Sequence, residues 1–332
     1  MDKAGRKLTP SEKIAAVYNK VGIFSILILL VVVCAFISPV FLSKTNIINL
    51  LTQTAVVTIV ACGITMLMIS GNTDLSAGSM VAFTGCLILG TYKQLTESYG
   101  FNPFLGTLSA LAVGIAASIA LYLFAAFIMT RYNVPAFIVT LAVSQSARGL
   151  VFIYTDGQVI NTIGDIVVIG QGKIFNFLPW PAVVMIIIAL ITWVILSKTR
   201  MGKYLYAIGG NVEAARAAGI NQKRTVINSY IIHAVFVALA GALFMARMNS
   251  AQPSAAVGLE FSAITAAIIG GTSLAGGIGT ATGTIIGSLI IGIIGNVLTL
   301  KSVQSYFQMI ITGLIIVLAV VIDIKTKGGK RK

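Results

Sequence analysis

The sequence predicts an all-α, polytopic membrane protein with about ten transmembrane helices and both termini in the cytoplasm. Hydrophobic residues make up 57% of the 332 residues and charged residues only 10%, against roughly a quarter charged in an average soluble domain. The mean hydropathy is +0.98. A soluble globule of this size cannot bury that much apolar side chain, so most of its surface faces lipid. The composition excludes a disordered chain, a disulfide-stapled secreted domain and an ordinary cytosolic enzyme.

Ten apolar segments account for the predicted helices, since a spanning helix needs about 20 mostly apolar residues. The segments are 21–40, 46–69, 75–92, 104–130, 136–154, 179–196, 226–246, 261–272, 280–300 and 306–323. The first has no small-x-small cleavage site after it and is predicted to be an uncleaved anchor. Segment 261–272 is short for a full crossing and is predicted to be a half-helix or part of a broken pair. The chain therefore divides into a basic segment (1–20), a transmembrane domain (21–323) with a long inner loop (198–224), and a basic tail (324–332).

The basic residues predict the orientation. With a cytoplasmic N-terminus and ten crossings, seventeen Lys and Arg residues fall inside and five outside, with Arg148 within a span. This agrees with the positive-inside rule, and an odd number of spans would move the basic tail outside. The net charge of +14 is thereby explained by residues that flank spans and meet membrane lipid, and no nucleic-acid partner is expected. Three cysteines in apolar runs, Cys34, Cys62 and Cys86, are predicted to be reduced packing residues, with no metal site.

Two short segments resemble each other and hint at an internal repeat. DLSA (74–77) opens one apolar segment and EFSA (260–263) opens another. By the alternation of spans, the first would lie at the inner side of the membrane and the second at the outer side. If the repeat is real, its halves are inverted, as in many transporters.

The motifs of catalysis are missing from the sequence. There is no G-x-x-x-x-G-K-[ST] loop for phosphate, no H-E-x-x-H and no paired-aspartate motif, so no cofactor is expected in this chain. The sole histidine, His233, is predicted to be a hydrogen-bonded structural residue, with a proton relay as the alternative. Each acidic residue is placed at a span edge or in a loop, which disfavours a carrier driven by an ion gradient.

The inner loop carries the most informative motif, GGNVEAARAAGIN (209–221). Asn211 can cap a helix start, Glu213 suits the positive end of the helix dipole, and Gly219 can end the helix. These features predict a short, alanine-rich helix outside the membrane that fits into a groove on a partner. A surface linker helix is the alternative.

Glu213-Ala214-Ala215 followed by Gly219 resembles the E-A-A-x3-G signature of permeases in ATP-binding-cassette importers. The chain is similar in particular to the ribose/galactose-type monosaccharide permeases, which share a family with the branched-chain amino-acid permeases. The similarity is carried by GNTDLSAGSMVAFTG (71–85), NVPAFIVT (133–140), the loop motif and ARMNSAQPSAAVGLEFSAITAAIIGGTSLAGG (246–277). Members often read G-G-I-D-L-S-V-G at 71–78 and carry aspartate at Ser262, so the assignment to ribose in particular is weakened.

The resemblance implies a homodimer of type II importer-like subunits in the bacterial cytoplasmic (inner) membrane. A separate cytoplasmic ATPase would hold ATP and Mg, and an extracytoplasmic sugar-binding protein would deliver substrate. The loop helix becomes the coupling helix, and Lys223 and Arg224 meet either acids of the ATPase or lipid head groups. The residues expected to couple to the ATPase are Asn211, Glu213, Ala214, Ala215, Arg216 and Gly219.

Three further groups of residues are candidates. Asp74 is predicted to be either a helix N-cap or part of a gate, and Arg148 either lines the path or extends to the outer interface. Gln252 and Glu260 either contact the binding protein or merely turn the chain, and Gly279, Gly283 and Gly287 form G-x-x-x-G steps for close helix packing. The path or gate candidates are Asn72, Asp74, Ser76, Gln145 and Arg148.

The predicted function is therefore transport of a monosaccharide, a ribose-like pentose or a hexose. A nucleoside or an amino acid is the nearest alternative cargo within the family. An ion-coupled secondary carrier and an intramembrane enzyme are the alternatives from other classes.

Overall fold

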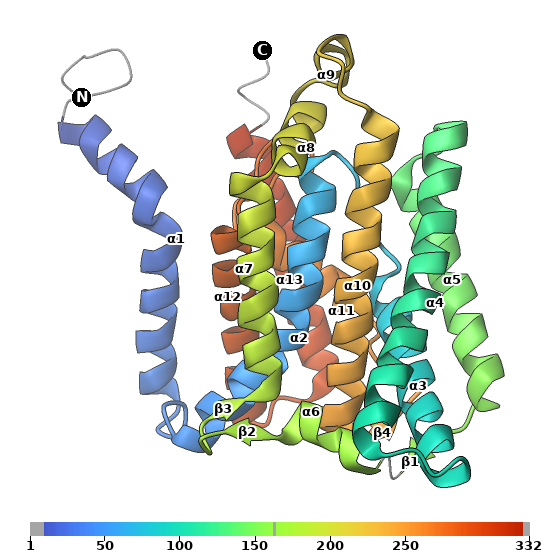
Figure 1. Ribbon diagram of the computed structural model, residues 1–332. Coiled ribbons are helices and arrows are strands. Elements are labelled where there is room, and N and C mark those ends of the chain that lie inside the picture. The colour runs from blue at the N-terminus through green and yellow to red at the C-terminus, as the bar shows by residue number, and fades with distance from the viewer. Residues whose placement is uncertain (1–9, 162–163, 328–332) are drawn as a thin grey trace.

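Long helices that run in alternating directions make up the protein (Figure 1). The computed structural model describes residues 10–161 and 164–327, so parts of the predicted basic segment (1–9) and basic tail (328–332) lie outside the described residues. The helices are α1 (Pro10–Ile37), α2 (Lys44–Ile69), α3 (Ala77–Lys93), α4 (Pro103–Tyr132), α5 (Ala136–Thr155), α6 (Val168–Gln171), α7 (Trp180–Lys198), α8 (Arg200–Gly210), α9 (Val212–Ala217), α10 (Gln222–Met248), α11 (Leu259–Ile269), α12 (Ala281–Leu300) and α13 (Ser305–Lys327).

Short irregular elements cover one end of the bundle. A π-helical turn (Gln94–Ser98) follows α3 and a 3-10 turn (Gly164–Val167) precedes α6. Two antiparallel pairs join β1 (Ile160–Asn161) to β4 (Ser250–Ala251), and β2 (Lys173–Ile174) to β3 (Leu178–Pro179). Figure 1 shows these strands at the end opposite α8 and α9.

The predicted helical, polytopic membrane fold is confirmed, with four two-residue strands in addition to the helices. Each of the ten predicted apolar segments overlaps one helix of the structure. Within the described residues, six helices are long and apolar enough to cross a membrane: α2, α4, α5, α7, α10 and α12. Shorter apolar stretches lie at 22–37 in α1, in α11, and at 305–321 in α13.

Helices α2 and α10 form the centre of the bundle. They are the most buried of the six long helices, and α10 packs against α2, α3 and α4. Helices α4 and α7 instead expose large apolar side chains, such as Phe124 and Leu190. These two helices therefore carry apolar surface that the bundle itself does not cover.

Two helices, α3 and α11, begin inside the bundle. Each follows a non-helical segment, 70–76 before α3 and 249–258 before α11. α3 ends beside the β1–β4 pair, where Lys93 Nζ donates to the carbonyl of Asn161 at 3.0 Å. α11 ends at the opposite side, where the backbone N–H of Gly277 donates to the carbonyl of Ile69 at 2.9 Å. The two helices therefore run in opposite directions.

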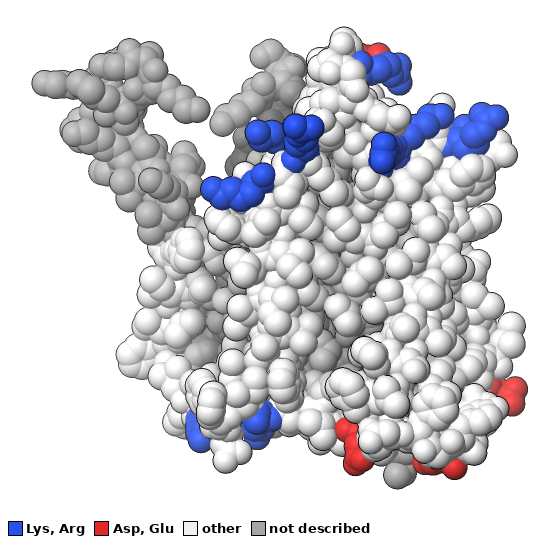
Figure 2. All heavy atoms as spheres, in the orientation of Figure 1, with Lys and Arg blue, Asp and Glu red and all other residues white. Residues whose placement is uncertain are grey.

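The inner loop forms two helices, whereas the sequence predicted one. α9 lies within the predicted range 211–221, but α8 was not predicted. α8 packs closely against the end of α2. A Cβ at Gly209 would sit 1.8 Å from the Ile69 carbonyl oxygen, so only glycine fits there. Figure 2 shows Lys and Arg gathered near the end that carries α8 and α9, whereas most of the visible Asp and Glu lie at the opposite end.

Candidate functional site

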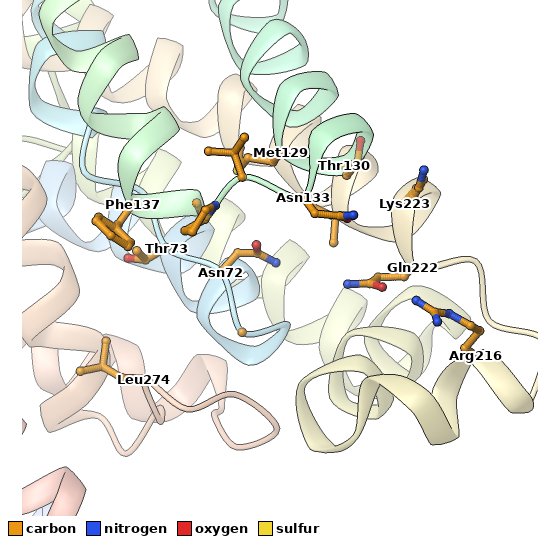
Figure 3. A pocket seen from close by; sticks show the side chains of 15 residues that line it. Asn72, Thr73, Met129, Thr130, Asn133, Phe137, Arg216, Gln222, Lys223 and Leu274 are labelled. Carbon is orange, nitrogen blue, oxygen red and sulfur yellow. The ribbon is translucent and has the colours of Figure 1, made fainter.

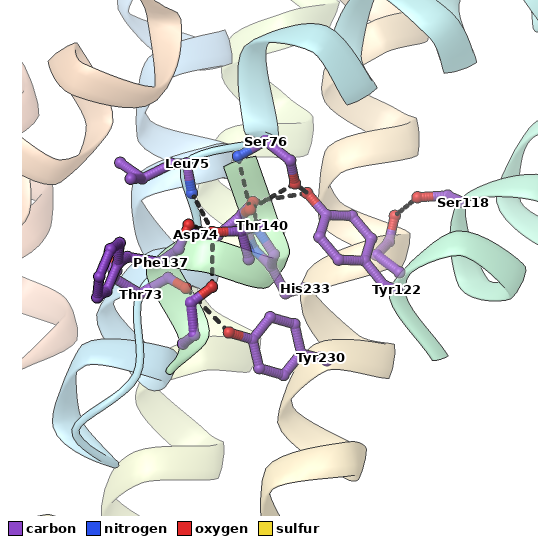
Figure 4. Close-up of polar contacts among 12 residues, drawn as sticks. Thr73, Asp74, Leu75, Ser76, Ser118, Tyr122, Phe137, Thr140, Tyr230 and His233 are labelled. Carbon is purple, nitrogen blue, oxygen red and sulfur yellow. Dashed lines mark hydrogen bonds and ion pairs between the residues drawn. The ribbon is translucent and has the colours of Figure 1, made fainter. Parts of the chain in front are cut away.

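A buried polar cluster surrounds Asp74, in the segment that leads into α3 (Figure 4). Tyr122 of α4 donates its hydroxyl proton to Asp74 Oδ2 at 2.6 Å, and His233 Nε2 of α10 lies 2.8 Å from the same oxygen. Asp74 Oδ1 accepts from the backbone N–H of Ser76 at 2.8 Å and from its hydroxyl at 2.5 Å. Asp74, Ser76, Tyr122 and His233 are all fully buried. The Asp74 carboxylate is thus hydrogen-bonded at both oxygens in a site without solvent.

Local sequence explains why the chain leaves the helix here. α2 ends at Ile69 with Ser70 as its C-cap, and Gly71 adopts a left-handed conformation with φ of 81°, which glycine reaches without steric cost. The N-cap position of α3 is Ser76, whose side chain makes no cap hydrogen bond because it donates to Asp74. Asp74 lies two residues earlier and accepts from Ser76, so the N-cap itself is not Asp74.

Asp74 occupies a non-helical segment, as the sequence predicted, but this segment lies within the bundle rather than at the membrane surface. His233 follows the start of α10 by eleven residues, which is about 16 Å along a helix axis. Asp74 is therefore a buried acid deep in the bundle. The predicted positions of the two similar segments, one inner and one outer, are also wrong, because α3 and α11 both begin in the interior.

His233 is a hydrogen-bonded buried residue, as expected, but its partner is an acid that the sequence analysis did not assign to it. Its ring fits because residue 63 is glycine: a Cβ at Gly63 would lie 2.1 Å from His233 Nδ1. The Tyr122 ring stands edge-on to the imidazole with centroids 5.1 Å apart. Tyr230, one turn before His233, donates to the carbonyl of Thr73 at 2.9 Å. Sequence reasoning missed both tyrosines.

The start of α11 meets the start of α3. A Cβ at Gly78 would lie 2.1 Å from Glu260 Oε2, so the Glu260 carboxylate occupies the space that this glycine leaves open. Glu260 was expected in an outer loop facing a binding protein, and the structure places it in the first turn of α11 against α3. Gln252 lies earlier in the same segment, where its Nε2 donates to Ser250 Oγ at 3.4 Å.

Arg148 of α5 fastens the segment that leads into α11. Its Nη1 donates to the carbonyls of Pro253 at 2.6 Å and Ala255 at 2.9 Å. These carbonyls have no helical partner, so the guanidinium satisfies acceptors that would otherwise be costly to bury. Gln145, one turn earlier, is exposed.

The glycines of α12 lie against α11 and its surroundings. A Cβ at Gly283 would sit 2.0 Å from the carbonyl oxygen of Gly270, and one at Gly287 would sit 2.0 Å from that of Ala266. A Cβ at Gly279, just before α12, would sit 2.8 Å from Ile69 Cγ1 of α2. Backbone therefore contacts backbone where α11 and α12 cross.

A cavity of about 480 Å³ lies at the end of the bundle that carries α9 (Figure 3). Asn72 and Thr73 line it from the segment before α3, and Arg216, Gln222 and Lys223 line it from α9 and α10. Asn72 Nδ2 donates to Ser70 Oγ at 3.0 Å. The cavity thus joins the predicted coupling loop to the segment that contains Asp74.

α9 has the predicted caps. The backbone N–H of Ala214 donates to Asn211 Oδ1 at 3.0 Å, and Gly219 has a φ of 79°. Arg216 and Glu213 form an exposed pair at 3.2 Å, while Ala215 is buried.

α8 packs against α9 and also bonds the segment that precedes α12. Tyr206 of α8 donates its hydroxyl proton to the carbonyl of Gly279 at 2.7 Å. A tyrosine hydroxyl is already protonated at neutral pH, and burial raises the pKa of Tyr206 further above its ordinary value.

Helices that begin inside a membrane bundle, next to a buried acid and a cavity, are characteristic of membrane transport proteins. Comparison with known proteins identifies the family. The family described as "Branched-chain amino acid transport system / permease component" matches residues 46–320. The chain belongs to this family, and it is a multi-pass protein of the cytoplasmic (inner) membrane.

Individual relatives match over nearly the whole chain. The ribose import permease protein RbsC of Bacillus subtilis is 38% identical over 93% of this chain and 94% of its own length. The ribose import permease protein RbsC of Escherichia coli K12 is 38% identical over 90% of this chain and 92% of its own. The D-allose transport system permease protein AlsC of E. coli K12 is 33% identical over 93% of each. No solved structure matches the chain significantly. The resemblance inferred from the sequence motifs is confirmed.

Proposed function

We propose that this chain is the membrane-spanning permease subunit of an ATP-binding-cassette importer that moves a monosaccharide into the cytoplasm. The observation that carries the proposal is the 38% identity, over nine-tenths of the chain, to permeases named for ribose import. Other relatives are named for allose and xylose, so the proposal is a monosaccharide rather than ribose alone. A nucleoside or amino acid is the alternative cargo.

The direction of the helices supports ten crossings. Six long helices, α1, α13, and the shorter helices α3 and α11 with their leading segments would make ten passages between the two ends of the bundle. The basic residues near α8 and α9 support a cytoplasmic location for that end, and with it cytoplasmic termini. The opposite directions of α3 and α11 support an inverted repeat.

The partners follow from the proposed role. Two copies would form the transport unit, a separate ATPase would bind α9 and hydrolyse ATP with Mg, and a sugar-binding protein would dock at the end that carries β1 to β4. The lipid contacts are proposed for the exposed apolar faces of α4 and α7. Exposure of Glu213 and Arg216 on α9 supports this helix as the contact with the ATPase.

The test is capture of the candidate ATPase by this chain in detergent, followed by ATP hydrolysis with sugar-loaded binding protein. Stoichiometric capture and stimulation are expected, and varying the sugar then names the cargo. Uptake that collapses with the ion gradient and needs no ATPase would instead indicate a secondary carrier.

Two variants test the role of α9. Glu213→Arg and Gly219→Trp are expected to insert normally but lose ATPase capture, because one reverses the exposed charge and the other blocks the turn at φ 79°. Glu97→Arg is the matched control: it also replaces an exposed glutamate that pairs with a basic neighbour, Lys93, but at the opposite end. Normal capture by both α9 variants would exclude α9 as the contact.

A further inference from the structure

We propose that the Asp74–His233–Tyr122 cluster fastens the start of α3 to α10, so that α3 and α10 move as one body when the ATPase displaces α9. This inference rests on the proposed function and assigns to these buried side chains the transmission of movement from α9 to the interior. Asp74, His233 and Tyr122 are positioning residues in this scheme.

The first step is the attachment of α9 to α10. Four residues separate them, and they are ordered by hydrogen bonds from Gly219 N–H to the Arg216 carbonyl at 2.9 Å and from Ile220 N–H to the Ala215 carbonyl at 3.0 Å. Asn221 then caps α10 by accepting from Arg224 N–H at 3.0 Å. A connection this short and this ordered transmits a displacement of α9 directly to α10.

The second step is the attachment of α10 to the segment before α3. Tyr230 and His233 lie three residues apart and so share one face of α10. The first bonds the Thr73 carbonyl and the second bonds the Asp74 carboxylate. Among the described residues, α5 contributes one hydrogen bond to the same segment: Leu75 N–H donates to Thr140 Oγ1 at 3.2 Å. Tyr122 of α4, a helix that packs closely against α10, adds a hydrogen bond to the same carboxylate. The segment is therefore held by α10 and α4 together more than by α5.

Burial makes this attachment stiff. A fully buried carboxylate that loses a partner pays its desolvation cost without compensation. Separation of Asp74 from His233 is therefore disfavoured in the absence of water, and a movement of α10 draws the start of α3 with it. Because Glu260 of α11 fills the space above Gly78, that movement also changes the junction between α3 and α11.

The test uses the assembled complex of this chain, its ATPase and the binding protein. Asp74→Ala and His233→Ala are expected to retain ATPase capture but to lower the ratio of stimulated to unstimulated hydrolysis, and transport, by about tenfold. Asp74→Asn, which keeps the volume and can still accept from Ser76, is expected to recover part of this loss. A purely structural role would lower capture, hydrolysis and transport together.

Ser118→Ala is the matched control. Ser118 lies one turn before Tyr122 on α4 and donates to the carbonyl of Ala234, next to His233, at 2.8 Å, but it does not touch Asp74. Its buried hydroxyl is lost without any change at the cluster, and wild-type coupling is expected. Where the alanine variants do not fold, Tyr122→Phe replaces them; it keeps the ring and removes one hydrogen bond to Asp74, and a several-fold loss of stimulation is expected.

A cross-link between α3 and α5 tests independently whether α3 has to move relative to α5 during transport. The hydroxyls of Ser79 on α3 and Ser144 on α5 lie 2.9 Å apart. Cysteines at both positions, in a chain whose native cysteines are replaced by alanine, are expected to block transport when oxidised and to release it on reduction. Full transport with the cross-link complete would overturn the proposal, as would wild-type stimulation in Asp74→Ala and His233→Ala.

The two proposals fail in different ways. If the unaltered chain captures no ATPase, the proposed function is wrong. If it captures the ATPase and is stimulated by loaded binding protein, but the cluster variants and the cross-linked protein behave identically to it, this inference alone is wrong.

Discussion

The two helices that begin inside the bundle, α3 and α11, are held in place by different forces. α3 is anchored by side-chain hydrogen bonds from Asp74 to α4 and α10. α11 itself is held by backbone packing, because glycines of α12 allow contact with the carbonyls of Gly270 and Ala266. Arg148 holds only the segment before it, at Pro253 and Ala255. The contacts of α3 need a charged carboxylate with correctly oriented donors, whereas those of α11 need glycines that have no side chain.

The acids at the two starts differ accordingly. Both oxygens of Asp74 have hydrogen-bond partners and the residue is fully buried. Glu260 is half-buried, and its Oε2 has no hydrogen-bond partner among the described residues. Asp74 is therefore hydrogen-bonded at both oxygens, while the Oε2 atom of Glu260 fills space over Gly78 with no hydrogen-bond donor among the described residues. The comparison predicts that removal of a single polar group destabilises the contacts of α3. It also predicts that a larger side chain at the α12 glycines destabilises the contacts of α11.

The largest effect is expected from Asp74→Ala. It leaves His233 and Tyr122 buried without their acceptor, and removal of one partner from such a site costs about 3–5 kcal/mol of unfolding free energy. Glu260→Ala is expected to cost less than about 1 kcal/mol by the same measurement, because no hydrogen bond to Oε2 is lost. Denaturant unfolding in mixed micelles, followed by tryptophan fluorescence, compares the two. Equal losses would remove the distinction between the two acids.

Added volume gives the next effect. Gly283→Leu places a side chain against the Gly270 carbonyl, which cannot move aside as a flexible side chain would, so a cost of about 3 kcal/mol is expected. Gly295→Leu on the same helix is the control, since no atom lies within 4 Å of the corresponding Cβ. Yield of folded, assembled protein by size-exclusion chromatography is the measurement. Similar yields for both variants would show that α11 does not depend on this contact.

Much of the fold was predictable because lipid-facing helices need long apolar runs, and these are visible in the sequence. α8 was not, since its eleven residues contain Arg200, Lys203 and three glycines, and its one apolar run (204–208) has only five residues. Its helix is held by the contact of Gly209 with Ile69 and by the bond from Tyr206 to Gly279, which join parts of the chain far apart in sequence.

The candidate site was predictable only in part. Asp74 and Ser76 were identified from the polar break between two apolar segments, but His233 is 159 residues away and Tyr122 lies in an apolar run. A usable signal existed: a sole histidine within a span and an acid in a polar break are both costly to bury unless they pair. Glu260 was assigned to an outer loop because a sequence does not show that the segment before α11 folds inward.

The third-largest effect is expected from Arg148→Gln, which tests whether Arg148 holds the segment before α11 in place. It removes the charge-assisted bonds to the carbonyls of Pro253 and Ala255, and a cost of about 2 kcal/mol is expected. Faster hydrogen–deuterium exchange at 252–260, with 71–78 unchanged, is the signature of a local effect. Arg148→Lys keeps the charge and is expected to recover part of the protection. Faster exchange in both segments would mean that the two anchors are coupled in the resting protein.

The smallest effect is expected from Tyr230→Phe, which shows how much a neutral hydrogen bond contributes to holding α3, compared with the charged Asp74 carboxylate. Tyr230→Phe removes one neutral hydrogen bond to the Thr73 carbonyl and is expected to cost about 1 kcal/mol. Tyr206→Phe removes a similar bond to the Gly279 carbonyl, near the start of α12, and is expected to cost no more, because Tyr206 is only half-buried. Both are measured by the same unfolding assay. If Tyr230→Phe costs as much as Asp74→Ala, the anchor of α3 is a cooperative hydrogen-bond network in which the charge of Asp74 has no special weight. If it costs about as little as Tyr206→Phe, the Asp74 carboxylate carries the anchor.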